Sequence, residues 1–300
     1  MGERKSIQFI VNPVSGYKNK EDMLTLIRNH LDHKKFDFSY VETQARGHGK
    51  ELSQQAVASG VDIIVACGGD GTVNEVAGPV THSNSTLAIL PNGSGNGFAM
   101  HVGMGRNSVK AIHKINNGET LTIDTCTVNG EFFLNLAGIG FDALIAYKAD
   151  KDTKRGLRMY ASIVSKELMA FQAERYRVKM DDEEITGEYT VVAIANAAMY
   201  GYNFHIAPLA KLTDGLLDVV FIKKASLLRT LGASWRMLNK SLDNSALVEI
   251  KKAQSVTVSM EQPYYYHVDG ESKTFDEPLH FNIIPQSLKI LLPSDSIGRV

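Results

Sequence analysis

Short apolar runs alternate with segments of helical periodicity over the first 120 residues of this 300-residue chain. The apolar runs predict strands, because they are short, contain β-branched or aromatic residues and are bounded by turn formers; they are Ile7–Val11, Phe36–Val41, Val61–Cys67 and Thr86–Leu90. The intervening segments predict helices at Lys20–His33, Gly49–Gly60, a stretch ending near Val80, and Asn107–Asn116. Strands that alternate with helices predict an α/β domain with an open, mainly parallel sheet.

The pattern changes near residue 120, where strand-like segments follow one another with turns between them. They are Leu121–Val128, Glu131–Leu136, Arg175–Met180, Tyr189–Ala195, Leu216–Ile222, Ser255–Met260 and Leu279–Ile284. Consecutive strands joined by turns predict an antiparallel β-sandwich as a second domain.

Two amphipathic helices interrupt the second half. The first, Leu157 to about Gln172, places on one face Leu157, Tyr160, Ala161, Val164, Leu168 and Phe171. The second, Leu227–Leu242, does the same with Leu228, Leu231, Trp235, Leu238 and Leu242. Packing of these faces against a sheet is the preferred interpretation, and contact with lipid is the alternative.

Composition and charge narrow the choice of partners and compartment. The net charge of −1 supplies no global field for nucleic acid, so we expect no nucleic-acid partner. Cys67 and Cys126 show no disulfide framework, which favours a reducing compartment. The charged N-terminus is unlike a signal peptide, although Gly2 and Ser6 match the loose myristoylation pattern.

A basic cluster leads into the first amphipathic helix and comprises Lys151, Lys154, Arg155 and Arg158. Binding to anionic lipid headgroups and an ordinary solvated helix start explain it equally well.

Polar and glycine-rich segments follow each of the first four predicted strands. They are the Asn12–Gly16 turn, Thr43, the Gly68-Gly69-Asp70-Gly71 corner and the Gly93–Gly97 loop. Because ligands of parallel α/β sheets bind beyond the carboxyl ends of the strands, these segments can line one edge. Free N–H groups at the helix start after the corner favour an anion. A carboxylate at Asp70 would repel a bare phosphate, so it indicates a phosphate that carries a metal ion.

Taken together, the motifs resemble the diacylglycerol kinase catalytic domain family, which includes soluble bacterial lipid kinases and sphingosine kinases. The resemblance rests on the following segments, in order: Asn12–Gly16, Gly68–Glu75, Leu90–Asn96, Asn135–Asp142, Ala207-Pro208, Asp214–Asp218 and Val268–Glu271. It implies an ATP-binding domain over residues 1–122 with a return of about 286–300, a β-sandwich lipid domain over 123–285, and an active site in the cleft between them.

The resemblance also implies roles for individual residues. The nucleotide contacts would be Asn12, Ser15, Gly16, Thr43, Gly68, Gly69, Asp70, Gly71, Thr72, Asn74 and Ser94. Glu271 would be the general base, Asp124 an active-site aspartate, and Asp70 part of the Mg²⁺–water network. Asp214, with the backbone of Lys211 and Leu216, would form a structural Mg²⁺ site. From the residues alone, a solvated residue after a turn is the favoured interpretation of Glu271. For Asp214, a turn residue before a strand and a metal ligand are equally good interpretations.

Two departures bear on the substrate. Many bacterial members have an aspartate where this chain has Gly97, which weakens a diacylglycerol assignment and leaves phosphoryl transfer intact. Tyr17 stands where some members place a basic residue, with Lys18 one step further on.

The expected function is therefore an ATP- and Mg²⁺-dependent lipid kinase, cytoplasmic and peripheral at the inner face of the membrane. Its acceptor would be diacylglycerol, a monoacylglycerol or a sphingoid base, and a homodimer is left open. The alternatives are a small-molecule kinase of the NAD kinase type and a catalytically silent lipid-binding regulatory module.

Overall fold

The computed structural model describes the chain except for residues 1–3, 17–19, 153–155, 169, 261–263 and 299. The described chain divides into two compact units, residues 1–125 with 285–300 and residues 126–284. The long strand β16 (Leu279–Leu292) begins in the second unit and ends in the first. The predicted departures at Tyr17 and Lys18 lie outside the described residues.

The first unit is built on a parallel sheet of strand order β2-β1-β3-β4-β16. The first four strands are β1 (Lys5–Val11), β2 (Phe36–Glu42), β3 (Ile63–Gly68) and β4 (Thr86–Pro91). Each neighbouring pair in this order is parallel, including the bridge between Ile290 of β16 and Leu87 of β4. The mainly parallel sheet predicted from the alternating pattern is thus confirmed.

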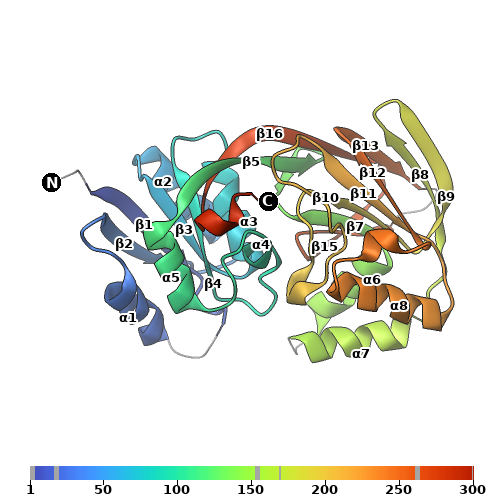
Figure 1. The fold of residues 1–300 in the computed structure, drawn as a ribbon, viewed down its shortest axis with the longest axis horizontal. Coiled ribbons are helices and arrows are strands. Elements are labelled where there is room, and N and C mark those ends of the chain that lie inside the picture. Colours follow the sequence, from blue (N-terminus) through green and yellow to red (C-terminus); the bar gives the residue numbers. More distant parts are fainter. Residues whose placement is uncertain (1–3, 17–19, 153–155, 169, 261–263, 299) are drawn as a thin grey trace. The chain divides into compact units, whose positions relative to one another are not determined.

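Helices cover the parallel sheet of the first unit, and Figure 1 shows them around strands β1 to β4. They are α1 (Lys20–His30), α2 (His48–Ala58), α3 (Asp70–Val80) and α5 (Ser108–Asn117). Helix α2 packs on α3, and α1 packs on α5. All six residues of β3 are buried, as expected for a central strand whose two faces are both covered by helices.

A short helix, α4 (Gly97–His101), follows the second glycine loop and was not predicted. The sequence there reads as a turn because of its glycines and asparagines. Asn96 before the helix adopts the left-handed conformation (φ 52°), which asparagine tolerates better than most residues. Phe98 and Ala99 are buried, so tertiary packing stabilises a helix that the local pattern does not indicate.

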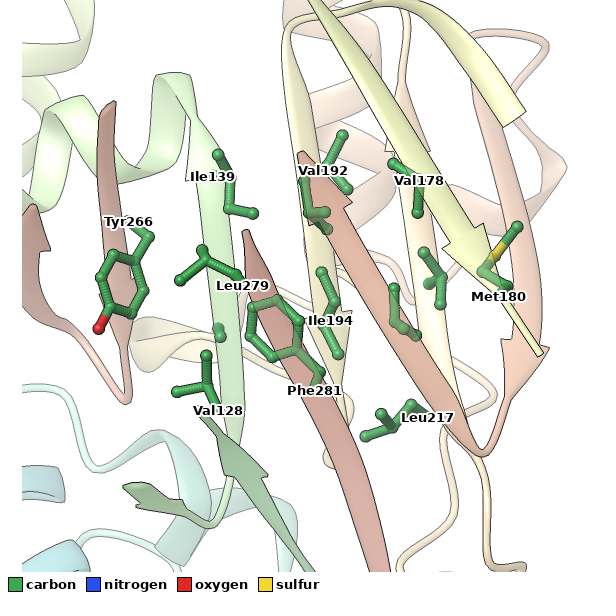
Figure 2. Packing of buried hydrophobic residues seen from close by; sticks show 14 of the residues in the cluster. Val128, Ile139, Val178, Met180, Val192, Ile194, Leu217, Tyr266, Leu279 and Phe281 are labelled. Atoms are coloured by element: carbon green, nitrogen blue, oxygen red, sulfur yellow. The ribbon is translucent and has the colours of Figure 1, made fainter. Parts of the chain in front are cut away.

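The second unit contains an antiparallel six-stranded sheet of order β12-β11-β10-β7-β14-β15. Its strands are β7 (Leu136–Gly140), β10 (Val191–Ala195), β11 (Leu217–Ile222), β12 (Val248–Ala253), β14 (Tyr264–Val268) and β15 (Glu271–Phe275). The opposing layer consists of β6 (Glu131–Phe133), β8 (Glu174–Met180), β9 (Glu183–Tyr189), β13 (Ser255–Ser259), and the adjoining parts of β5 (Glu119–Val128) and β16. Figure 2 shows apolar side chains such as Ile139, Ile194 and Phe281 packed between the strands. The predicted antiparallel sandwich is confirmed.

Several elements of the second unit were missed or merged. The predicted strand 131–136 corresponds to β6 and reaches only the first residue of β7, and the predicted strand 189–195 corresponds to β10 and includes only the last residue of β9. Helix α6 (Phe141–Lys151) and strands β12, β14 and β15 were not predicted. Strand β7 reads Leu-Ala-Gly-Ile-Gly and lacks the β-branched density on which strand prediction depends, yet all five of its residues are buried.

The two amphipathic helices are present, but some residues of their apolar faces are exposed. In α7 (Leu157–Glu167) Met159 is the one buried residue, and Leu157 is 48% exposed. In α8 (Leu227–Leu238) Trp235 is 66% exposed. The preferred interpretation, packing of these faces against a sheet, is therefore wrong for Leu157 and Trp235. None of the helices in the described residues is both long enough and apolar enough to span a bilayer.

Candidate active site

The carboxyl ends of four parallel strands bring the predicted site segments of the first unit to one sheet edge. Asn12, Thr43, Gly69 and Asn92 are the residues that immediately follow β1, β2, β3 and β4. Hydrogen bonds continue the ladder past the strand ends, since Asn12 N–H donates to the Cys67 carbonyl and Asn92 N–H to the Gly68 carbonyl. The expectation that these segments share an edge follows from the parallel registers.

The Asn12–Gly16 turn is tied to the other two loops through side chains. Asn12 Nδ2 donates to Thr72 Oγ1 at 3.2 Å, and Asn92 Nδ2 donates to the Ser15 carbonyl at 2.9 Å. Gly16 has φ of +82°, and a Cβ there would lie 2.2 Å from Asn92 Oδ1. The turn therefore needs glycine at this position both for its conformation and for the close approach of Asn92.

The glycine corner and the second glycine loop touch backbone to backbone. A Cβ on Gly93 would lie 2.4 Å from the Cα of Gly69, a distance that real Cβ atoms do not show. A Cβ on Gly68 would lie 2.3 Å from Thr72 Oγ1. Asn96 shapes the second loop, because its side chain both donates to the Gly93 carbonyl and accepts from the Gly93 N–H. The glycines thus serve close packing of the two loops as well as access for a ligand.

Asp70 caps the unpredicted helix α4. Its two carboxylate oxygens accept hydrogen bonds from the backbone N–H groups of Gly97 and Phe98, each at 3.1 Å. A carboxylate at a helix N-terminus satisfies amides that have no partner in the helix and is favoured by the helix dipole. Asp70 therefore already has a structural task, besides the metal-related role that the resemblance implies.

Glu75, at the end of the corner motif, has an analogous task at α2. Its Oε1 accepts from the Gly47 N–H at 2.8 Å, and its Oε2 accepts from the Gly49 N–H at 3.0 Å. Sequence reasoning did not assign a role to Glu75. No local pattern could have indicated this role, because the partners of Glu75 lie 26 and 28 positions earlier in the chain.

The remaining predicted nucleotide residues of the first unit differ in exposure. Thr43 and Thr72 are buried, Gly71 and Asn74 are half-buried, and Ser94 is exposed. The structure adds Arg106, which sequence reasoning missed: its guanidinium donates to the Ser94 carbonyl at 2.6 Å. An exposed arginine bonded to the backbone of a glycine loop places positive charge beside that loop.

Asp124 is fully buried on β5 and accepts a hydrogen bond from the Gln286 backbone N–H at 2.8 Å. Gln286 has a positive φ of 47°, which interrupts the regular course of β16. The described contacts of Asp124 therefore concern the two strands that run between the units. Its place among active-site residues stays a prediction.

In the second unit, Glu271 is the first residue of β15, directly after a tight turn. Asp269 and Gly270 both have positive φ (49° and 88°), the conformation of a two-residue hairpin turn. Asp269 anchors this turn by accepting backbone N–H bonds from Leu134, Asn135 and Leu136 at 2.9–3.1 Å. Glu271 is half-buried and pairs with Val268 across the hairpin, so its backbone position is well defined.

A polar cluster that the sequence did not reveal includes His267, which lies on β14, the strand that leads to this turn. Asp142 Oδ2 accepts from the Tyr200 hydroxyl at 2.6 Å and lies 3.2 Å from His267 Nε2. Burial and the neighbouring Asp142 raise the pKa of Tyr200 well above its usual value. A Cβ on Gly138 would lie 1.9 Å from Asp142 Oδ2, so this glycine makes room for the cluster. The partners come from α6, β14 and the segment after β10, which only folding brings together.

The predicted structural Mg²⁺ site is arranged as an ion pair. Asp214 Oδ1 accepts from the Leu216 N–H at 3.1 Å, and Asp214 Oδ2 lies 2.7 Å from Lys252 Nζ. Lys252 Nζ is also 3.2 Å from the buried carboxylate of Asp218. An ammonium group thus lies beside both carboxylates. The bond from Leu216 to Asp214 uses the Leu216 N–H group, whereas a metal ion would be held by a backbone carbonyl oxygen. The Mg²⁺ site formed by Asp214 with the backbone of Lys211 and Leu216 therefore stays a prediction.

Comparisons with known families cover nearly the whole chain. Residues 6–128 match the diacylglycerol kinase catalytic domain, and residues 135–292 match the YegS C-terminal NAD kinase beta sandwich-like domain. A diacylglycerol kinase of Bacillus subtilis is 27% identical over 272 residues, which is 89% of this chain and 90% of the relative.

Solved structures agree on the fold. The crystal structure of a diacylglycerol kinase from Bacillus anthracis aligns with a TM-score of 0.75 at 21% identity, covering 99% of this chain and all of that one. An NAD kinase from Archaeoglobus fulgidus in complex with ATP aligns with a TM-score of 0.51 at 12% identity, covering 98% and 96% of the two chains.

Proposed function

The chain belongs to the diacylglycerol kinase catalytic domain family and is a lipid kinase, a phosphotransferase with an alcohol acceptor, and on this premise we propose its reaction in detail. It transfers the γ-phosphoryl group of ATP to a hydroxyl group of diacylglycerol, a monoacylglycerol or a sphingoid base. It acts as a peripheral enzyme at the cytoplasmic face of the membrane, where ATP and such lipids meet.

The observation that carries the nucleotide assignment is the convergence of three loops at one edge of the parallel sheet. The Asn12–Gly16 turn, the glycine corner and the second glycine loop are joined by hydrogen bonds and by the Gly69–Gly93 approach. Phosphoryl transfer depends on positioning and charge neutralisation more than on covalent chemistry. Backbone N–H groups of such loops, together with Arg106, suit the phosphates of ATP.

A magnesium ion on the phosphates fits this edge. Mg²⁺ in kinases is held by one or two carboxylates, waters and the substrate phosphates, and a dedicated cage of side chains is not required. Asp70 is the carboxylate of the glycine corner, and the resemblance assigns it to the Mg²⁺–water network on the phosphates. When bound, the ion would neutralise charge on the transferred phosphoryl group.

Glu271 is proposed as the general base. A lipid alcohol is a weak nucleophile, and a carboxylate within hydrogen-bond reach assists by accepting its proton. Glu271 follows a hairpin turn that Asp269 holds in place through three backbone hydrogen bonds. The backbone from which the Glu271 side chain extends is therefore well positioned. Asp269 itself is committed to these bonds, so it is the less suitable base of the two.

A kinase of the NAD type is the second candidate, favoured by the similar fold of the archaeal NAD kinase. Its alignment is weaker than that of the diacylglycerol kinase structure. A catalytically silent lipid-binding module is the third. Retention of both Asp70 and Glu271 argues against it.

The test is phosphate transfer from labelled ATP to a panel of diacylglycerol, monoacylglycerol, sphingosine and NAD, with products identified by mass spectrometry. We expect a phosphorylated lipid and no NADP. Turnover of NAD alone would replace the proposal with the second candidate. Lipid binding with no ATP consumption, whatever the acceptor, would favour the silent module.

A further inference from the structure

Helix α8 presents its aromatic residue away from the sheet on which it lies. Ala233 is buried and Met237 is partly buried against the cluster on the outer face of the six-stranded sheet. Trp235 and Leu238, which lie on the opposite side of the helix by their spacing from Ala233, are 66% and 36% exposed. Trp235 is the one tryptophan in the chain. Trp235 and Leu238 are three positions apart on the helix, so they are neighbours on its surface and form one small exposed apolar patch.

The charge around this helix is one-sided. Residues 223–240 contain five basic and no acidic residues, whereas the whole chain has a net charge of −1. Four of these basic residues are exposed, namely Lys223, Lys224, Arg229 and Lys240, and the fifth, Arg236, is half-buried and donates to the Ser241 carbonyl. The positive charge is therefore concentrated on the segment that also exposes Trp235.

We propose that α8 with its flanking residues 223–240 is a docking surface for an anionic phospholipid bilayer. A helix with basic residues beside exposed Trp and Leu is the composition that lies in the plane of a membrane interface. Tryptophan is favoured at the level of the lipid headgroups, and each nearby Lys or Arg adds attraction to anionic lipids. This inference rests on the proposed lipid substrate, because it supplies the route by which the enzyme reaches lipid.

A second copy of the chain fits the same surface less well. Two such segments facing one another would bring ten basic residues together without an acidic partner in either segment. Like charges across an interface oppose association. An anionic bilayer can both bury the exposed apolar side chains and neutralise the positive charge of this segment.

The single tryptophan provides a direct test without ATP. We expect the emission of Trp235 to move to shorter wavelength when vesicles of phosphatidylcholine and phosphatidylglycerol (3:1) are added, and to be quenched by brominated lipid. Vesicles of phosphatidylcholine alone should produce little change. An unchanged spectrum with anionic vesicles would overturn the proposal.

Variants separate the apolar and charged contributions in a vesicle sedimentation assay. Trp235→Ala should weaken partitioning about tenfold, and Trp235→Phe should restore most of it. Arg229→Glu should weaken it about fivefold or more. Lys179→Glu is the matched control, because it makes the same charge change at an exposed lysine on β8 and should bind like the wild type. Binding of Trp235→Ala and Arg229→Glu at wild-type strength would overturn the proposal.

The remaining outcomes are distinguished by two further measurements. A dimeric mass in light scattering, with a blue shift that depends on protein concentration in the absence of vesicles, would overturn the proposal in favour of self-association. Turnover of a water-soluble short-chain diacylglycerol, measured separately, should be unaffected by Arg229→Glu. Vesicle binding without any lipid phosphorylation would refute the proposed function alone, and phosphorylation without vesicle binding would refute the docking surface alone.

Discussion

The carboxylate of Asp70 accepts hydrogen bonds from the backbone amides of Gly97 and Phe98, and this joins the glycine corner to the start of α4. An acidic side chain in a phosphate-binding corner looks unfavourable by charge alone. The bonds to a helix N-terminus explain how it is stabilised before any metal or nucleotide binds. By joining the glycine corner to the second glycine loop, these bonds also help to hold the other backbone N–H groups of the two loops at the sheet edge.

Asp70→Asn should therefore lower stability even without nucleotide. The amide nitrogen cannot accept an N–H bond, so one of the two α4 amides loses its partner, and we expect a loss of about 1–3 kcal/mol in the free energy of unfolding. Denaturant unfolding of the protein without ATP measures it. Asp37→Asn, an exposed aspartate on β2, is the control and should change stability little. Equal stability of the two variants would show that the bonds to α4 contribute nothing.

Gly93→Ala should be strongly destabilising, because its Cβ would lie 2.4 Å from Gly69 Cα and the two loops would have to separate. We expect a loss of about 3 kcal/mol or more, comparable with severe overpacking, together with loss of ATP binding. Gly232→Ala is the matched control on α8, where a Cβ meets nothing within 4 Å. Removing a helical glycine there should raise stability by about 0.5–1 kcal/mol. Thermal unfolding of both variants checks the pair.

Glu271→Gln should retain the fold and ATP binding and lose most turnover. The glutamine keeps the shape of the side chain but cannot accept the proton of the lipid hydroxyl, and such a loss typically costs about 100- to 10,000-fold in rate. Glu277→Gln, an exposed residue of the same unit, should be as active as the wild type. Comparable rates for the Glu271 variant and the wild type would remove Glu271 from the mechanism.

Glu174 should make stability depend on pH in the weakly acidic range. Burial raises the pKa of Glu174 from 4.5 to about 7, although the Tyr176 hydroxyl, 3.4 Å away, opposes the rise. The native state therefore binds a proton that the unfolded state has lost, so stability falls as pH rises from about 4.5 to about 7. Because Glu174 is partly exposed, we expect only about 1 kcal/mol. Melting temperatures of Glu174→Gln, measured across this range, should lack that fall; an identical pH profile would contradict the assignment.

Lys252 should stabilise the second unit through its ion pairs with Asp214 and Asp218. Lys252→Met leaves Asp218, which is 1% exposed and whose pKa is raised by burial, without its counterion. We expect a loss of about 2–3 kcal/mol, less than for a fully buried pair because Lys252 is partly exposed. Lys252→Arg should recover part of it. A chelator should leave the melting temperature of the wild type unchanged; a clear drop would instead support the predicted Mg²⁺ site at Asp214.

Much of the architecture could be predicted because it depends on local pattern. In the first unit, β3 and β4 are continuous apolar runs and β2 alternates apolar with polar residues, and the alternation of these strands with helices implies parallel order. Elements such as β7 and α6 could not be predicted in this way. Their residues, Leu136–Gly140 and Phe141–Lys151, lack a clear local period, and burial against distant strands decides their conformation.

The sequence by itself determined which residues reach the carboxyl edge of the parallel sheet, because chain order and parallel pairing leave little choice there. Only the tertiary structure decided what those side chains do. Asp70 meets Gly97 and Glu75 meets Gly47 across 27 and 28 positions of the chain. The outward direction of Trp235 was also decided by folding. Helical spacing groups apolar residues on one face, but only the folded chain shows that Ala233 and Met237 are the residues of α8 that pack against the cluster on the sheet.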